Sequence, residues 1–170
     1  MKYIIEHYIR LAFLSAKPQD CPLSLALQKV LICLYLFLSI INALAIYEVS
    51  SGAVYSVVDL ILLYVFTKLI LRGKKERFNQ TFNAFLGVGI FIGLLHTICS
   101  YSFIVDQNTQ MISALGKSLF FIIFIWIIIA YGHIVRHAAE LNFSAGLSIS
   151  LGYTLLNAML LVSISEMLRI

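Results

Sequence analysis

The sequence predicts an all-α polytopic membrane protein: a compact bundle of five transmembrane helices, preceded by a short interfacial amphipathic helix. Of its 170 residues, 61% are hydrophobic and 12% are charged, whereas about a quarter of the residues in soluble domains are charged. Several apolar runs reach the roughly 18 residues that indicate a membrane-spanning helix. Between two of these runs, the six residues from Arg72 to Arg77 contain four cations. These residues must form a loop, because hydrocarbon excludes charge of this density.

Residues 1–22 are expected to form an interfacial helix and a linker, ahead of a transmembrane domain at 23–170. Tyr3 to Ala16 is mostly apolar but contains three ionisable side chains. The segment is therefore too short and too charged to span a bilayer, and we expect it to lie along the membrane surface. It should end at Lys17-Pro18, because proline disfavours helical backbone in the residue before it.

The remaining apolar runs set the expected spans. They lie at about 25–47, 54–71, 85–105, 115–135 and 145–167. Between them we expect tight turns at 48–52 and 106–110, the basic loop, and a polar connector at 136–142. Connections this short place successive helices antiparallel in a compact bundle.

The distribution of lysine and arginine predicts the orientation. Ten of these residues fall on the side of the N-terminus and the basic loop, and only Lys117 and Arg169 fall on the other side. Cytoplasmic loops carry the excess of positive charge. We therefore expect a multi-pass protein of the cell inner (plasma) membrane, with a cytoplasmic N-terminus and, after five spans, an external C-terminus.

The same cations indicate which partners the protein could contact. The cluster of Arg72, Lys74, Lys75 and Arg77, together with Arg136, can either follow from topology alone or contact anionic headgroups or an acidic partner. The net charge of +4 lies beside membrane segments, so no nucleic-acid partner is expected. Expected partners are membrane lipids and either another membrane protein or further copies of this chain.

Four polar side chains interrupt the spans: Asn42, Asp59, His96 and Asn157. An ionisable group within a bilayer is costly and is a functional hypothesis by default. One hypothesis is a proton or ion path in which Asp59 and His96 exchange protons or bind a cation. The preferred interpretation is structural, with a neutral Asp59 hydrogen-bonded to Asn42 so that the bond holds two helices together.

A possible metal site lies near the end of the fourth span. His133, His137 and Glu140 are spaced i, i+4 and i+7 on one helical face, which could supply three zinc ligands. The metalloprotease pattern H-E-x-x-H is not met, because Ile134 occupies the position of its glutamate. A polar helix end explains the same residues, so we expect no metal, no other cofactor and no catalytic residues.

Small residues mark two stripes at four-residue spacing. Gly89 and Gly93 form one, and Ser144, Ser148 and Gly152 form the other. Such residues allow close approach of helix backbones, either within one chain or between two copies.

Three stretches resemble the membrane domain of the Ypt-interacting-protein (YIP) family in its short bacterial form. They are Ser15 to Pro22, Gly73 to Phe85 with Arg77-Phe78-Asn79-Gln80-Thr81, and Trp126 to Glu140. The resemblance implies five transmembrane helices, a cytoplasmic N-terminus and a non-enzymatic function. Eukaryotic members of that family engage small GTPases and help to shape or sort membranes.

The sequence therefore predicts a non-enzymatic membrane scaffold, adaptor or assembly partner whose interaction surface is cytoplasmic. The alternative is a small oligomeric proton- or ion-coupled transporter or channel that uses Asp59 and His96.

Overall fold

The computed structural model describes residues 2–44, 49–102, 104–106, 111–112 and 114–167. The α-helices are α1 (Lys2–Ala12), α2 (Leu25–Leu44), α3 (Val49–Ile70), α4 (Phe78–Ser102), α5 (Ala114–Ala139) and α6 (Phe143–Met167). Short 3-10 helices η1 (Pro18–Asp20) and η2 (Lys75–Arg77) precede α2 and α4, and strands β1 (Ile104–Asp106) and β2 (Met111–Ile112) pair antiparallel. In the described residues, α2 to α6 are each long and apolar enough to cross a membrane. The all-α class and the five apolar helices are confirmed.

Several predicted boundaries are wrong. The turn expected at 48–52 contains the start of α3 from Val49, and the third span extends back to Phe78 instead of starting at 85. Its predicted end is also wrong, because 104–106 forms β1. Residue 48 and residues 107–110 of the predicted turns lie outside the described part of the chain. The connector predicted at 136–142 is only three residues long in the structure, because α5 continues to Ala139 and α6 begins at Phe143.

The error at the start of α4 has a physical cause. Polar residues in its first turns suggested a loop, but they are hydrogen-bonded within the bundle. The buried Asn83 donates through Nδ2 to Pro22 O at 3.3 Å, and Gln80 donates through Nε2 to Gln19 O at 2.6 Å. Polar side chains with such partners are compatible with a packed helix.

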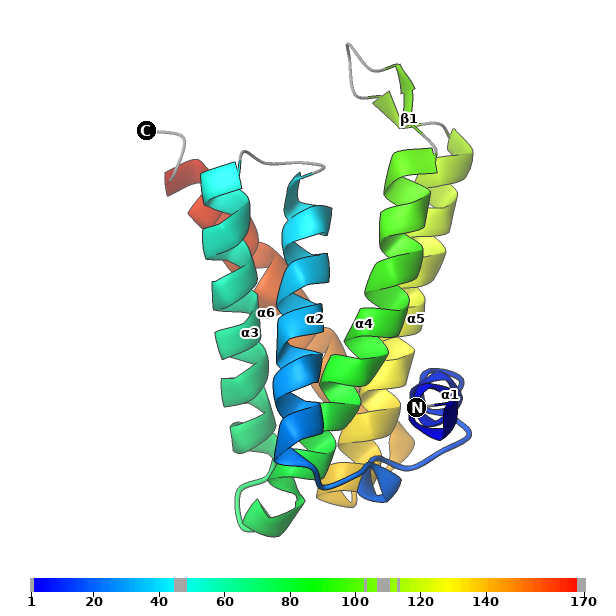
Figure 1. Ribbon diagram of the computed structural model, residues 1–170, viewed down its shortest axis with the longest axis vertical. Helices are drawn as coiled ribbons and strands as arrows, with labels where there is room; N and C mark the ends of the chain where they lie inside the picture. Colours follow the sequence, from blue (N-terminus) through cyan, green and yellow to red (C-terminus); the bar gives the residue numbers. More distant parts are fainter. Residues whose placement is uncertain (1, 45–48, 103, 107–110, 113, 168–170) are drawn as a thin grey trace.

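Helix α4 forms the centre of the fold and contacts α1, α2, α3 and α5. The side chains of Phe85, Leu86 and Val88 are fully buried. Figure 1 shows that the 71–77 loop, η1 and the α5–α6 turn gather at one end of the bundle. The hairpin of β1 and β2 lies at the opposite end, where α6 diverges from α5 (Figure 1).

Helix α1 packs against α4 and α5 and belongs to the same hydrophobic core. Leu11 and Ala12 are fully buried. Trp126 on α5 donates through Nε1 to Ala12 O at 2.8 Å, and the His133 ring lies 2.8 Å from Ala16 O. The N-terminal segment is therefore held at the last residue of α1 and at Ala16, which follows the helix. Its expected position at the membrane surface stays a prediction.

The closest approach of α5 and α6 uses two glycines that the predicted stripes did not include. A Cβ on Gly146 would lie 2.6 Å from Gly132 O, and a Cβ on Gly132 would lie 3.0 Å from Leu147 Cα. By contrast, Ser144, Ser148 and Gly152 are exposed. Of the predicted stripes, Gly89 does permit a close contact, because a Cβ there would lie 2.8 Å from the Tyr35 ring.

We expect Gly146→Ala to lower the stability of the bundle, because the added methyl must push α5 and α6 apart. Overpacking of this kind costs about 1–3 kcal/mol. Gly152→Ala is the matched control, since a Cβ at that position on the same helix meets nothing within 4 Å. Thermal unfolding in one detergent measures both variants. Equal unfolding midpoints for the two variants would contradict the close contact between α5 and α6 at Gly146.

Candidate functional site

A cavity of about 650 Å³ lies between α2, α3, α4, α5 and α6. Its walls are mainly apolar, but several polar side chains also line it: Tyr35, Asn42, Asp59, His96, Tyr153 and Asn157. All four polar residues predicted within the spans therefore face one space. The lining segments belong to the half of the bundle that carries the hairpin, where the helices splay (Figure 1).

Asp59 is the acidic side chain of this cavity and is only 8% exposed. Its Oδ2 accepts a hydrogen bond from Tyr35 Oη at 2.6 Å, and its Oδ1 accepts one from Asn157 Nδ2 at 2.6 Å. Donors at both oxygens suit an ionised carboxylate, which only accepts hydrogen bonds. The three residues come from α3, α2 and α6, so Asp59 joins these helices.

Asn42 belongs to a second and separate set of contacts. Its Nδ2 donates to Leu38 O at 3.0 Å and to Gly93 O at 3.3 Å, which fixes the orientation of the amide. The Oδ1 atom therefore faces His96 Nδ1, at 2.8 Å. Because an amide oxygen only accepts, the imidazole carries a proton on Nδ1.

The predicted hydrogen bond between Asp59 and Asn42 is therefore wrong. The structure pairs Asp59 with Tyr35 and Asn157, and pairs Asn42 with His96. Sequence reasoning missed Tyr35, although one signal was present. Tyr35 and Asn42 are seven residues apart, which places them on the same face of a helix.

The cavity is open on the side formed by α5 and α6. Lys117, Phe121 and Phe124 of α5 line it and are exposed, as is Ala158 of α6. In a bilayer, this rim would bring aromatic side chains into contact with lipid. Lys117 lies in the first turn of α5, at the end of the bundle opposite the basic loop.

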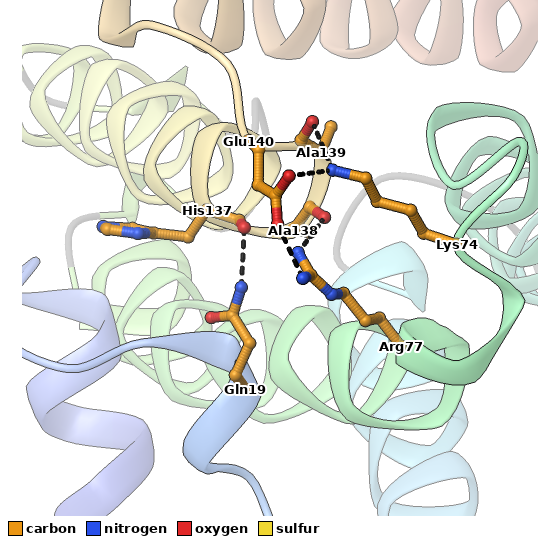
Figure 2. Close-up of polar contacts among 7 residues, drawn as sticks. All are labelled: Gln19, Lys74, Arg77, His137, Ala138, Ala139 and Glu140. Carbon is orange, nitrogen blue, oxygen red and sulfur yellow. Dashed lines mark hydrogen bonds and ion pairs between the residues drawn. The ribbon is translucent and has the colours of Figure 1, made fainter.

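The predicted cytoplasmic cations have a different environment. Figure 2 shows Lys74 and Arg77 reaching the carboxylate of Glu140, which follows the last residue of α5. Lys74 Nζ lies 2.5 Å from Glu140 Oε2, and Arg77 Nη2 lies 2.6 Å from Glu140 Oε1. The cations beside Glu140 hold the pKa of its carboxyl below the ordinary value.

The same side chains bind the carbonyl end of α5. Lys74 donates to Ala139 O at 3.2 Å and Arg77 donates to Ala138 O at 3.3 Å. Gln19 donates to His137 O at 2.6 Å (Figure 2). These carbonyls have no partner within their own helix, and cations near a helix C-terminus are favourable. We call Gln19, Lys74 and Arg77 the α5 clamp.

Of the five cations proposed for partner contact, Lys74 and Arg77 are thus engaged within the chain. Arg136 lies over the Phe143 ring at 5.6 Å and donates to His137 Nε2 at 3.3 Å. Of the five cations, only Arg72 and Lys75 are exposed, as contact with headgroups or an acidic partner would require.

The structure does not assemble the alternative zinc ligands. The His133 ring contacts Ala16 O, Glu140 is bound by the clamp, and the His137 ring points away from Glu140 (Figure 2). Among the described residues, no three histidine, cysteine, aspartate or glutamate side chains gather at metal-binding distances.

We expect Glu140→Gln to lower the unfolding midpoint at neutral pH, because the ion pairs with the clamp are lost. Since the folded-state pKa is depressed, this contribution is present above the ordinary value of 4.5 and disappears as pH falls through the lower folded-state pKa. The midpoints of wild type and variant should therefore converge in acid. Glu76→Gln, an exposed acid of the same loop, is the control. A difference that does not change with pH would contradict this role for Glu140.

No family model, curated protein or solved structure matches this chain. Membership of the YIP family therefore stays a prediction from the three resembling stretches.

Proposed function

We propose that this chain is a small, non-enzymatic transporter in which a solute enters the cavity and Asp59 binds the solute or a coupled proton. The observation that carries the proposal is the buried carboxylate on the wall of a cavity of about 650 Å³. Ligand pockets in proteins have volumes of roughly 300–1,000 Å³. A side chain that only links helices needs no adjoining space of this size.

The energetics of Asp59 support the same proposal. Burying an unpaired charge has an effective penalty of several kcal/mol. The described contacts of this carboxylate are with Tyr35 and Asn157, which are both neutral donors. A proton or a cationic group of the solute would supply the missing positive charge. His96, which the sequence placed on the same path, lines the cavity but bonds to Asn42.

We also propose the inner membrane as the location, with the α5 clamp and the basic loop in the cytoplasm. The excess of Lys and Arg at that end supports this orientation. The wide end of the cavity would then face the outer half of the bilayer, and Asp59 would be reached from outside or from the lipid.

The orientation predicts that a reporter fused after Ile170 is active if it works only outside the cytoplasm, and inactive if it works only in the cytoplasm. A reporter fused before Met1 should be active only in its cytoplasmic form. The two fusions act as controls for each other, and a cytoplasmic reading for both would overturn the orientation.

A membrane adaptor is the second candidate, and the exposure of Arg72 and Lys75 favours it. These two side chains could contact an acidic partner without disturbing the α5 clamp. An adaptor of this kind makes no use of Asp59. The two candidates therefore give opposite expectations for the same variant.

We expect purified protein in liposomes to dissipate an imposed proton gradient faster than protein-free liposomes do. Asp59→Asn should reduce the added rate at least tenfold, because the amide cannot exchange a proton at neutral pH. Glu166→Gln is the matched control, since this exposed acid on α6 does not line the cavity. A pH-sensitive dye trapped in the lumen gives the rates.

Equal rates for wild type and Asp59→Asn would contradict transport through Asp59. The adaptor would then remain, and its partner should be lost in a variant with Arg72→Gln and Lys75→Gln.

A further inference from the structure

We infer that the ligand of this cavity is an organic cation with an apolar body, whose charged group sits beside Asp59. The inference rests on the proposed function, since it names the class of solute for the same cavity. The charge, the aromatic rings and the shape of the site all support this class of ligand.

The charge comes first. Asp59 is the acidic side chain of the lining, and it is 8% exposed. The basic groups of the lining are His96, which bonds to Asn42, and Lys117, which lies in the first turn of α5. The buried carboxylate of Asp59 therefore attracts a cation.

Aromatic rings surround this carboxylate. Tyr35 donates to Asp59, and the rings of Tyr131 and Tyr153 have centroids 6.3 Å apart. A Cβ on Gly89 would lie 2.8 Å from the Tyr35 ring and 2.9 Å from Tyr131 Oη, so these two tyrosines also lie close together. All three tyrosines line the cavity. Aromatic rings beside a carboxylate favour an organic ammonium, because the ring faces attract cations and need no coordinating lone pairs.

An inorganic cation fits this site less well. Ca²⁺ takes six to eight oxygen ligands and Mg²⁺ prefers six at fixed geometry. In the described lining, one carboxylate and a few phenol and amide groups face a space of about 650 Å³. The volume is that of an organic molecule.

The rim of the cavity suggests the rest of the ligand. Phe121 and Phe124 are exposed on α5 at the open side, where the bundle would contact lipid. An apolar body could lie against these rings while its cationic group reaches Asp59. A fully polar cation would leave these rings without an apolar partner in the ligand.

Tetraphenylphosphonium and tetraphenylborate test the inference, because the two ions have nearly the same shape and opposite charge. We expect purified protein in lipid nanodiscs to bind the phosphonium saturably, at one site per chain, and at least tenfold more tightly than the borate. Titration calorimetry measures both affinities. Equal affinities, or tighter binding of the borate, would overturn the inference, as would failure of both ions to bind while phospholipid copurifies in the cavity.

Variants locate the site. Asp59→Asn should weaken phosphonium binding at least tenfold, a loss of about 1.4 kcal/mol or more. Asp59→Glu should keep most of the affinity, and Tyr153→Leu should weaken it several-fold. Glu166→Gln should change nothing. If Asp59→Asn does not fold, the comparison of Asp59→Glu with Tyr153→Leu decides, and equal affinity in these two variants would overturn the site.

The binding experiment is independent of transport. Proton flux without phosphonium binding would overturn the organic cation as the ligand class, and the proposed transport function would still stand. Phosphonium binding without proton flux would leave the ligand class and remove proton transport through Asp59.

Discussion

The carbonyl end of α5 is the point on which the rest of this structure depends. A helix ends with carbonyls that lack a partner within the helix, and in a membrane protein each of them needs one from elsewhere. Here Gln19, Lys74 and Arg77 supply the donors from two other segments. One set of bonds therefore joins the linker after α1 and the α3–α4 loop to the end of α5.

This closure at one end explains the opening at the other. The glycine contact between Gly132 and Gly146 brings α5 and α6 together close to the clamp. Because long helices curve only gently, two that touch at one end and cross at an angle separate at the other (Figure 1). The space between them becomes part of the cavity, and α2, α3 and α4 supply its remaining walls with side chains such as Tyr35, Asp59 and His96.

Much of the fold could be predicted from the sequence because each span is a long apolar run, and length alone identifies such a run. The ends of the helices could not be predicted in the same way. Asn83 and Gln80 looked like loop residues, and only tertiary partners such as Pro22 O reveal why they fit in a helix. Tertiary partners also distinguish Lys74 and Arg77, which pair with Glu140, from Arg72 and Lys75. The sequence alone gives no reason to treat these two pairs of cations differently.

The candidate site was predictable as a set of residues but not as a set of contacts. The apolar runs around Asn42 and Asp59 placed both residues within the spans. The direction in which each side chain points depends on how helices rotate against one another, which no local pattern records. Asp59 turned toward Tyr35 and Asn157, whereas Asn42 turned toward α4.

The position of Asp59 has a consequence for motion. Its two hydrogen bonds join α2, α3 and α6 on one side of the cavity, whereas α4 and α5 form the other side. A ligand that binds Asp59 shares the carboxylate oxygens with Tyr35 and Asn157, so binding and the contacts among these three helices are linked. A ligand shifts a conformational equilibrium only by its difference in affinity for the two states. The carboxylate is where such a difference can arise, since it is both the anchor of the helices and the charged group of the cavity.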